Sequence, residues 1–589
     1  EELKQSAARR VKTVSDMRYY WKKILKKNCH QNNPNKTRIV HITGTKGKGS
    51  TACMCEAILR SHGYTTGLFT SPHLISIRER IRWNGKPIHK RMFGQVYWKI
   101  RKALLEEENE EEENDDPPPK LPGYFRMLTL MGLYTFLFQI PDSGNNKNHK
   151  IDVIVLEVGM GGRYDATNFL DKTLDDNEKM IAGVTCGVTL LDLDHTRILG
   201  DTLEKIAWEK GGIFAQQKLG GPISDRFPGS SEETNKEDQD PLTKRPKLQE
   251  QASSASSSQQ SERRFYILDS NTKGVMNVME SCARVEGQGG TLVPIDATGS
   301  ELRQALQKVA AGEQQTQQVS LGLAGQHQYG NATLAVALCQ DAIDTPTAEM
   351  IRIDSPTTLN ALINATWPGR CQTYRPEEDG PYGKFTFYLD GAHTPQSLEA
   401  TVEWFQSLLV PQSQQHQAPI LVFNCSHERN PVELLQLLSK TGILFEHVYF
   451  AKSDSSRPSP ISKESAKQLL QQQNIPVRSE WLTGNENHND NNSTTPATWQ
   501  ETLASIWKHL TYNHDEADVS TTGTMDTPIH CNQSATQVLE DLLLQYPQPE
   551  QNDAETGAST IPIFVTGSLY LVGSFLTALQ WEEDSAPPE

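Results

Sequence analysis

The chain has 589 residues and a formal net charge of −16, and 36% of its residues are hydrophobic. This length exceeds what a single core usually holds, so we expect two or more domains. The negative charge argues against nucleic acid as the main partner, although the acidic run at 106–116 supplies much of it. Nine cysteines without a Cys-x-x-Cys pair argue against a disulfide framework or a zinc site and favour a reducing compartment.

No segment of the sequence is long and apolar enough to predict a membrane span. The longest apolar stretch, at 128–140, is shorter than the ~20 residues that a spanning helix needs. The chain starts with a basic region, but Glu1, Glu2 and Asp16 do not fit a transit peptide, and any presequence would have been trimmed before residue 1. We therefore expect the protein in the cytoplasm, the mitochondrion or both.

Strand-like and helix-like segments alternate from Thr37 onward, which predicts an α/β protein with parallel sheets and crossover helices. The apolar run at 151–156 is nearly continuous, as in strands that are buried on both faces. A short hairpin is expected to turn at Asn84-Gly85. The other expected elements of this first part are strands at 38–43, 65–69, 151–158, 181–189 and 265–268, and helices at 90–105, 125–139 and 203–210.

The same alternation resumes after a polar stretch near residue 315. Strands are expected at 319–323, 385–389, 420–424, 447–450 and 561–565, and helices at 331–343, 396–409, 431–440 and from 569 onward. We therefore expect an N-terminal domain at 1–318 and a smaller, Rossmann-like C-terminal domain at 319–589. Polar segments that cannot bury enough apolar surface to order themselves are read as insertions, at about 106–120, 222–262, 484–495 and 515–527.

Residues 40–50 form the most informative motif, an apolar strand that leads into a glycine-rich loop and then a helix. Glycines at 44, 47 and 49 allow backbone N–H groups to turn toward phosphates, and Lys48 can reach a terminal phosphate. The hydroxyl of Ser50 or Thr51 can face Mg²⁺. A strict Walker pattern has glycine where this chain has Ile42, so the loop alone is only moderately specific. The loop predicts that the N-terminal domain at 1–318 binds ATP.

Further polar residues follow other expected strands and should reach the same sheet edge as the loop. These are Ser71 after the second strand, Glu157 at the end of the third, and His195 after the fourth. Lys210 precedes a double glycine at the end of an expected helix. Each residue taken singly has a plainer structural explanation, such as a turn or a helix-end charge. Together, around one phosphate loop, they favour a functional site with hard-cation ligands.

These motifs resemble the Mur ligase superfamily and, within it, the folylpolyglutamate synthases. The resemblance covers nearly the whole chain outside the insertions. It is carried by the segments 44–50, 71–73, 157–162, 194–195, 209–213, 325–331, 367–370 and 390–397. It implies that the ATP phosphates are bound by Lys48 and the surrounding loop, that is, Gly44, Thr45, Gly47, Gly49, Ser50 and Thr51.

The resemblance also implies a metal site and contacts from the second domain. Ser71, Glu157 and His195 would hold Mg²⁺, and Lys210 would be carbamylated and bind a second Mg²⁺. A monovalent cation such as K⁺ is a further cofactor of this kind of site. In the second domain Asn331 would contact the adenine, Arg370 the γ-phosphate, and Asp390 and His393 the ribose and phosphate region, so that catalysis takes place in an interdomain cleft.

The implied reaction is ATP-dependent addition of L-glutamate to the γ-carboxylate of the glutamate tail of tetrahydrofolate or its polyglutamates, through an acyl phosphate. A monomer with only small-molecule substrates is expected. The nearest alternative is dihydrofolate synthase, which joins glutamate to dihydropteroate, or an enzyme with both activities. Gly49 disfavours a cell-wall Mur ligase, in which Ser or Thr follows the lysine directly. A nucleotide-binding scaffold without catalysis is the alternative from another class.

Overall fold

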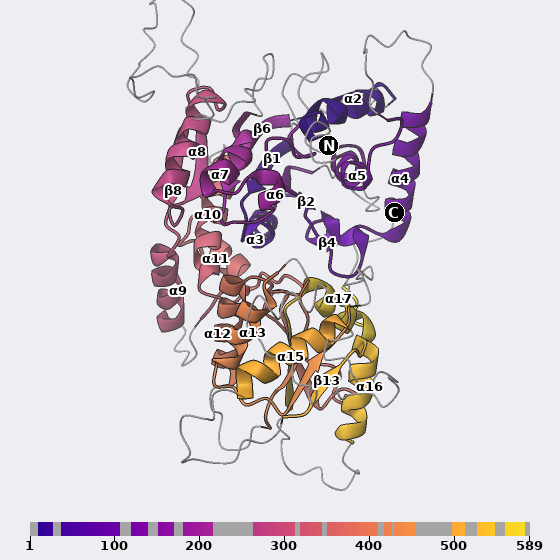
Figure 1. Cartoon of the computed structure of the whole chain (residues 1–589). Coiled ribbons are helices and arrows are strands. Elements are labelled where there is room, and N and C mark those ends of the chain that lie inside the picture. The colour runs from indigo at the N-terminus through magenta and orange to yellow at the C-terminus, as the bar shows by residue number, and fades with distance from the viewer. Residues whose placement is uncertain are drawn as a thin grey trace, which may run out of the picture.

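The computed structural model describes most of the chain, arranged as two α/β units (Figure 1). The described residues are 10–27, 37–106, 119–139, 151–169, 181–215, 263–312, 319–343, 350–409, 417–426, 429–453, 498–512, 527–547 and 560–583. The expected insertions lie outside these ranges, apart from one to three residues at the ends of the segments 106–120 and 515–527. Within these ranges no helix has the length and apolar character that crossing a membrane requires.

The first unit is built on a sheet that has eight strands within the described residues, in the order β4-β3-β2-β5-β1-β6-β7-β8. All neighbouring strands are parallel except for the β2-β3 and β3-β4 pairs, and β3 and β4 form the hairpin expected at Asn84-Gly85. The strands are β1 Thr37–Thr43, β2 Thr66–Phe69, β3 Ile81–Trp83, β4 Lys86–Pro87, β5 Val153–Glu157, β6 Ile181–Val188, β7 Arg264–Leu268 and β8 Thr291–Ile295.

Helices cover both faces of this sheet, which explains the continuous apolar run in β5. Val153 and Val155 belong to the core under α3, while Ile154 and Leu156 belong to the core under α2, α4 and α5. The helices of this unit are α2 Thr13–Lys26, α3 Lys48–Ser61, α4 Lys90–Leu105, α5 Tyr124–Phe138, α6 Thr196–Leu199, α7 Leu203–Gly211, α8 Lys273–Val285 and α9 Ser300–Gly312, with short 3₁₀ turns at Ile77–Arg80 and Gly212–Ala215.

Two later helices, α10 (His327–Ala342) and α11 (Pro356–Ile363), also pack on the first sheet. Their apolar side chains share one core with α3, β1 and β5. The strand expected at 319–323 is absent from the described structure, where Leu321 and Leu323 are instead buried in that core from an irregular segment. We therefore propose that the two units divide between Ile363 and Gln372 rather than after residue 318.

The second unit has a smaller sheet, with the order β13-β12-β11-β14-β10-β9 within the described residues, parallel except for the β10-β9 pair. Alternate residues of β11 face two cores: Leu421 lies under α12, α13 and α15, and Val422 lies under α16 and α17. The elements are β9 Gln372–Tyr374, β10 Phe385–Leu389, α12 Pro395–Leu409, β11 Ile420–Phe423, α13 Pro431–Ser439, β12 His447–Phe450, α15 Trp499–Tyr512, β13 Ile529–Cys531, α16 Ala535–Gln545, β14 Ile561–Thr566 and α17 Leu569–Ala578.

Candidate active site

A cleft of about 1320 Å³ lies between the two units and collects most of the predicted site residues. Both units contribute to its walls. The predicted residues that line it are Thr45, Gly47, Lys48, Gly49, Ser50, Ser71, Glu157, His195, Asn331, Arg370, Asp390 and His393. The predicted residues Gly44, Thr51 and Lys210 are not part of the wall and lie just behind it. The sequence therefore identified residues that the fold brings together from distant segments.

The glycine-rich loop connects β1 to α3 and is anchored to the end of β6. Gly44 and Gly47 have φ values of 147° and 86°, and a Cβ at Gly44 would lie 1.8 Å from the Thr189 hydroxyl. The backbone N–H groups of Thr45 and Lys46 donate to the Leu190 carbonyl at 2.9 and 3.1 Å. The positive φ values at Gly44 and Gly47 and the close approach of Thr189 to Gly44 require glycine at these positions, so the loop conformation follows from the sequence.

Lys48 is the first residue of α3, so its ammonium group lies at the positive end of a helix dipole. Its Nζ donates to the Thr45 carbonyl within the loop at 3.3 Å. The two candidate hydroxyls next to it differ. Ser50 lines the cleft and accepts a hydrogen bond from Gln328, whereas Thr51 is fully buried and its Oγ1 has no hydrogen-bond partner among the described residues. Ser50 is thus the hydroxyl that can face a ligand.

Glu157 ends β5 and lies beside Ser71, which follows β2. The Ser71 N–H donates to Glu157 Oε2 at 2.9 Å. Burial raises the pKa of the Glu157 carboxyl, while Lys48, the Ser71 N–H and Arg370 act to lower it. Cationic groups from the phosphate loop and from the segment leading into the second unit therefore act on the same buried carboxyl. When it is ionised, a buried carboxylate in this position can bind a cation that enters the cleft.

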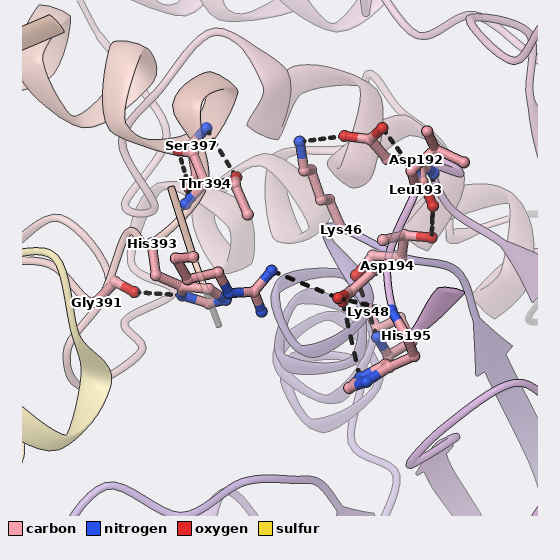
Figure 2. A network of polar contacts seen from close by, with 12 residues as sticks. Lys46, Lys48, Asp192, Leu193, Asp194, His195, Gly391, His393, Thr394 and Ser397 are labelled. Atoms are coloured by element: carbon pink, nitrogen blue, oxygen red, sulfur yellow. Dashed lines mark hydrogen bonds and ion pairs between the residues drawn. The ribbon is translucent and has the colours of Figure 1, made fainter. Parts of the chain in front are cut away.

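Asp194 and His195 follow β6 and face the second unit across the cleft (Figure 2). The His195 ring is half exposed, with Nε2 3.8 Å from Asp194 Oδ2, and its backbone is left-handed with φ 50°. Arg429 of the second unit lies 3.5 Å from Asp194. Burial by itself would raise the pKa of Asp194, but His195, Arg429 and Lys48 lower it below its usual value. Asp194 is therefore an anionic link between the two walls.

Lys210, at the end of α7, is buried behind the phosphate loop. Its Nζ donates to the Gly44 carbonyl at 2.6 Å. Burial and the neighbouring Lys48 lower the pKa of the Lys210 ammonium well below its usual value. An amine in this setting is readily held neutral.

Asn331 was assigned from the sequence to the second domain, and this assignment needs correction. It lies on α10, which packs against the first sheet, and a Cβ at Gly47 would come within 2.5 Å of its Oδ1. Its Nδ2 donates to Gln328 at 3.0 Å. The amide therefore supports the phosphate loop from behind while still lining the cleft.

The second unit presents the loop that connects β10 to α12. Both oxygens of the buried Asp390 carboxylate are used within the protein, since they accept from the N–H groups of Cys371 and Ala392 and from the Thr401 hydroxyl at 2.7–2.9 Å. His393 Nδ1 lies 2.8 Å from the Gly391 carbonyl, and burial lowers the pKa of this imidazole. Asp390 thus holds the segment that starts with Arg370, while His393 faces the cleft.

The wall also contains charged residues to which the sequence interpretation gave no role, among them Lys46, Arg10 and Arg429. Lys46 Nζ contacts Asp192 and Gln396, both at 2.6 Å, and so joins the phosphate loop to the start of α12. Arg10, which precedes α2, pairs with Glu209 at 2.5 Å. Arg429 lies six residues after the end of β11 at Phe423 and pairs with Asp194, and no spacing in the sequence points to it.

The described residues hold no group of three or more His, Cys, Asp or Glu side chains that could bind a metal ion. Ser71 and Glu157 lie together and offer a hydroxyl and a carboxylate. His195 lines the same cleft, but its ring is directed toward Asp194. The metal set predicted from the sequence therefore stays a prediction for all three residues.

A phosphate-loop α/β domain that faces a second α/β domain across a cleft agrees with the Mur-ligase-like fold expected from the sequence. Two solved structures share the fold. One is "Mycobacterium tuberculosis Folylpolyglutamate Synthase Complexed with ADP and AMPPCP" (TM-score 0.55, 18% identity, 98% of this chain and 96% of that one). The other is E. coli FolC in complex with DHPP and ADP (TM-score 0.52, 19% identity, 96% and 92%). No family model matches the chain.

Comparison with curated relatives identifies the family to which the chain belongs. The human mitochondrial folylpolyglutamate synthase is 31% identical over 583 residues, covering 93% of this chain and 83% of the relative. The Arabidopsis thaliana folylpolyglutamate synthase is 28% identical over 579 residues, with 92% and 81% covered. The chain belongs to the folylpolyglutamate synthase family.

Proposed function

We propose that this protein is an ATP-dependent ligase that adds L-glutamate to the γ-carboxylate of the glutamate tail of tetrahydrofolate. Beside the family membership, one observation carries the proposal. Lys48 and Glu157 of the first unit line the same cleft as Arg370 of the connecting segment and His393 of the second unit. An enzyme that must phosphorylate a carboxylate and then exclude water needs cationic groups on both sides of a closable cleft.

A carboxylate does not condense with an amine at neutral pH, because its leaving group would be oxide. In the proposed mechanism the γ-phosphoryl group of ATP is transferred to the tail carboxylate, with Lys48 and Arg370 neutralising the charge that is shared among the oxygens. The α-amine of glutamate then attacks the resulting acyl phosphate and expels inorganic phosphate. Closure of the units keeps water from this intermediate.

The donor set near the loop fits a hard divalent cation in part. Ser71 and Glu157 offer oxygen atoms at the carboxyl ends of β2 and β5, and Ser50 offers another from the first turn of α3, as Mg²⁺ prefers. His195 is a weaker candidate, because its ring is half exposed and near Asp194. Bound Mg²⁺ would supply charge neutralisation at the phosphates. Glu157 and Ser71 would hold it, and K⁺ stays a prediction.

Lys210 is proposed to carry a carbamate that binds a second Mg²⁺. The support is its burial and its lowered ammonium pKa, since only a neutral amine combines with CO₂. A carbamate keeps one N–H, so the bond to the Gly44 carbonyl can persist after modification. The carbamate would then add an anionic group directly behind the phosphate loop.

Two of the assigned roles change with the geometry. Asn331 is proposed to support Gly47 in addition to approaching the adenine, because its amide touches the loop. Asp390 is proposed to position Arg370 and Cys371 rather than to contact the ribose, because both of its oxygens already accept hydrogen bonds. His393 keeps the proposed role of approaching the nucleotide phosphates.

The substrates we propose are ATP, L-glutamate and tetrahydrofolate or its polyglutamates, without nucleic acid. The proposed location is the cytoplasm, the mitochondrion or both, in keeping with the mitochondrial name of the human relative. The expected monomeric state stays a prediction.

The test is ADP release and incorporation of labelled glutamate with tetrahydrofolate and dihydropteroate as alternative acceptors. We expect incorporation with tetrahydrofolate and release of one ADP for each glutamate added. Incorporation with dihydropteroate alone would make the protein a dihydrofolate synthase. Nucleotide binding without turnover on either acceptor would contradict a ligase.

A further inference from the structure

The last described residues of the chain are joined to the hairpin of the first unit. Glu583, five residues beyond α17, forms a two-pronged ion pair with Arg82 of β3, with Nη1–Oε1 and Nη2–Oε2 distances of 2.5 and 2.9 Å. The Arg82 side chain is only 3% exposed and that of Glu583 24%. Parallel N–H···O bonds of this kind fix the orientation of both groups, and they are screened less by salt when buried.

Arg82 makes three further contacts besides its ion pair with Glu583. Its Nε donates to the Glu79 carbonyl and its Nη1 to the Gly85 carbonyl, both at 3.1 Å. The guanidinium lies 4.7 Å from the ring centroid of Trp367. Trp367 lies in the connection that leads from α11 of the first unit to β9 of the second. A guanidinium fixed by Glu583 therefore forms the surface against which this connection rests.

The connection itself is short and tied at several points. Cys53 of α3 contacts the Thr366 carbonyl at 3.4 Å, so the helix that follows the phosphate loop holds the residue before Trp367. The Arg370 N–H donates to the Trp367 carbonyl at 3.1 Å, which closes a turn. Any displacement of the Trp367 ring therefore moves Arg370, three residues along and inside the cleft.

We infer that Glu583 and Arg82 are positioning residues, which hold Trp367 and thereby set where Arg370 stands relative to Lys48 and Glu157. This inference rests on the proposed function, in which Arg370 meets the γ-phosphate. Glu583 lies outside the wall of the cleft, whereas Arg82 and Trp367 are part of it, so Glu583 acts only through these two residues. Their effect reaches the reaction through the turn at 367–370.

The experiment compares Glu583→Gln with Glu582→Gln, an exposed neighbour that serves as the matched control. Binding of ADP and of AMPPCP, a triphosphate analogue, is measured with the full chain, together with kcat and KM for ATP. We expect Glu583→Gln to weaken AMPPCP binding and lower kcat by about tenfold, because a misplacement of the order of 1 Å is enough for such a loss. ADP binding should be unchanged, since ADP has no γ-phosphate, and Glu582→Gln should resemble the wild type.

Further variants separate a positioning role from a merely structural one. Glu583→Asp should recover part of the preference for AMPPCP over ADP. The double variant Arg82→Lys with Glu583→Gln should lose no more of this preference than the more harmful single variant, because both changes break the same pair. Equal weakening of ADP and AMPPCP, or a lowered melting temperature with unchanged AMPPCP preference, would overturn the inference. So would a Glu583→Gln enzyme that behaves like the wild type.

Arg370→Ala distinguishes the failure of this inference from failure of the proposed function. If Arg370→Ala loses the AMPPCP preference and Glu583→Gln does not, the positioning role is wrong and the proposed function stands. If the wild type ligates no glutamate, or Arg370→Ala binds AMPPCP normally, the assignment of Arg370 fails first.

Discussion

The two units meet at two places that differ in burial. Beside the connecting segment lies the linker contact, made of Arg82, Glu583 and Trp367, in which the guanidinium is 3% exposed. Across the mouth of the cleft lies the rim contact, made of the Lys46–Gln396 bond and the Asp194–Arg429 pair, whose two charged side chains are each 27% exposed.

The difference in burial predicts a difference in behaviour. A single contact between partly exposed side chains contributes little and is screened by salt. The linker pair is two-pronged and its guanidinium is 3% exposed, although Glu583 is 24% exposed, so its geometry is stricter and it is harder to break. The linker contact should therefore persist while the rim contact opens and closes around substrates. Lys48, Glu157 and Arg370, to which the proposed function assigns the chemistry, line the same cleft.

The largest effect is expected for Lys48, which lines the cleft between the two units. If Lys48 is not needed for activity, neither contact can matter through this site. Lys48→Ala should lower folate-dependent ADP release by about a thousandfold, because a cationic donor to the transferred phosphoryl group is lost. The measurement is steady-state ADP release, with the melting temperature as a check on folding. Lys308→Ala, an exposed lysine of α9, is the control. Full activity of Lys48→Ala would refute the site.

A somewhat smaller loss is expected behind the loop. Lys210→Ala should lower activity by about a hundredfold, and short carboxylic acids such as acetate should restore part of it by occupying the place of the carbamate. Lys205→Ala on the same helix, a surface residue paired with Asp201, is the control. A mass spectrum that finds an unmodified lysine in fully active enzyme would contradict the carbamate.

The comparison itself is tested by breaking one contact at a time. Gln396→Ala at the rim should change kcat by no more than about twofold, because an exposed hydrogen bond to a charged group adds little. The linker variant Glu583→Gln should have the larger effect, and raising the salt concentration should weaken the Asp194–Arg429 pair of the rim more than the linker pair. If Gln396→Ala proves more harmful than Glu583→Gln, the two contacts have been ranked in the wrong order.

The smallest effect concerns pH. Burial lowers the pKa of His393, so this side chain takes up a proton on unfolding when the pH lies between its folded value and the usual value of 6.5. Stability should thus fall as the pH falls through that window, and His393→Gln should make the fall shallower. Denaturant unfolding at several pH values measures this, and identical pH profiles for the two proteins would be evidence against it.

Much of the architecture follows from local patterns. The helix expected at 90–105 and the strands expected at 385–389 and 447–450 occur with those bounds. Apolar period and helix-ending residues decide such elements within a few residues of the chain. The strand expected at 319–323 was wrong, because Leu321 and Leu323 are buried by contacts with α10 and α11 and not by a neighbouring strand.

By itself the sequence determined the phosphate loop, the family resemblance and the identity of the residues at the strand ends, because these depend on glycine φ angles, spacing and residue chemistry. Three further points were decided only by the tertiary structure. Asn331 lies on a helix that packs against the first sheet, and both oxygens of Asp390 accept hydrogen bonds within the protein. Glu583 forms an ion pair with Arg82. The physical reason is distance along the chain: a pair separated by 501 residues leaves no local pattern, and only packing of the two units brings it together.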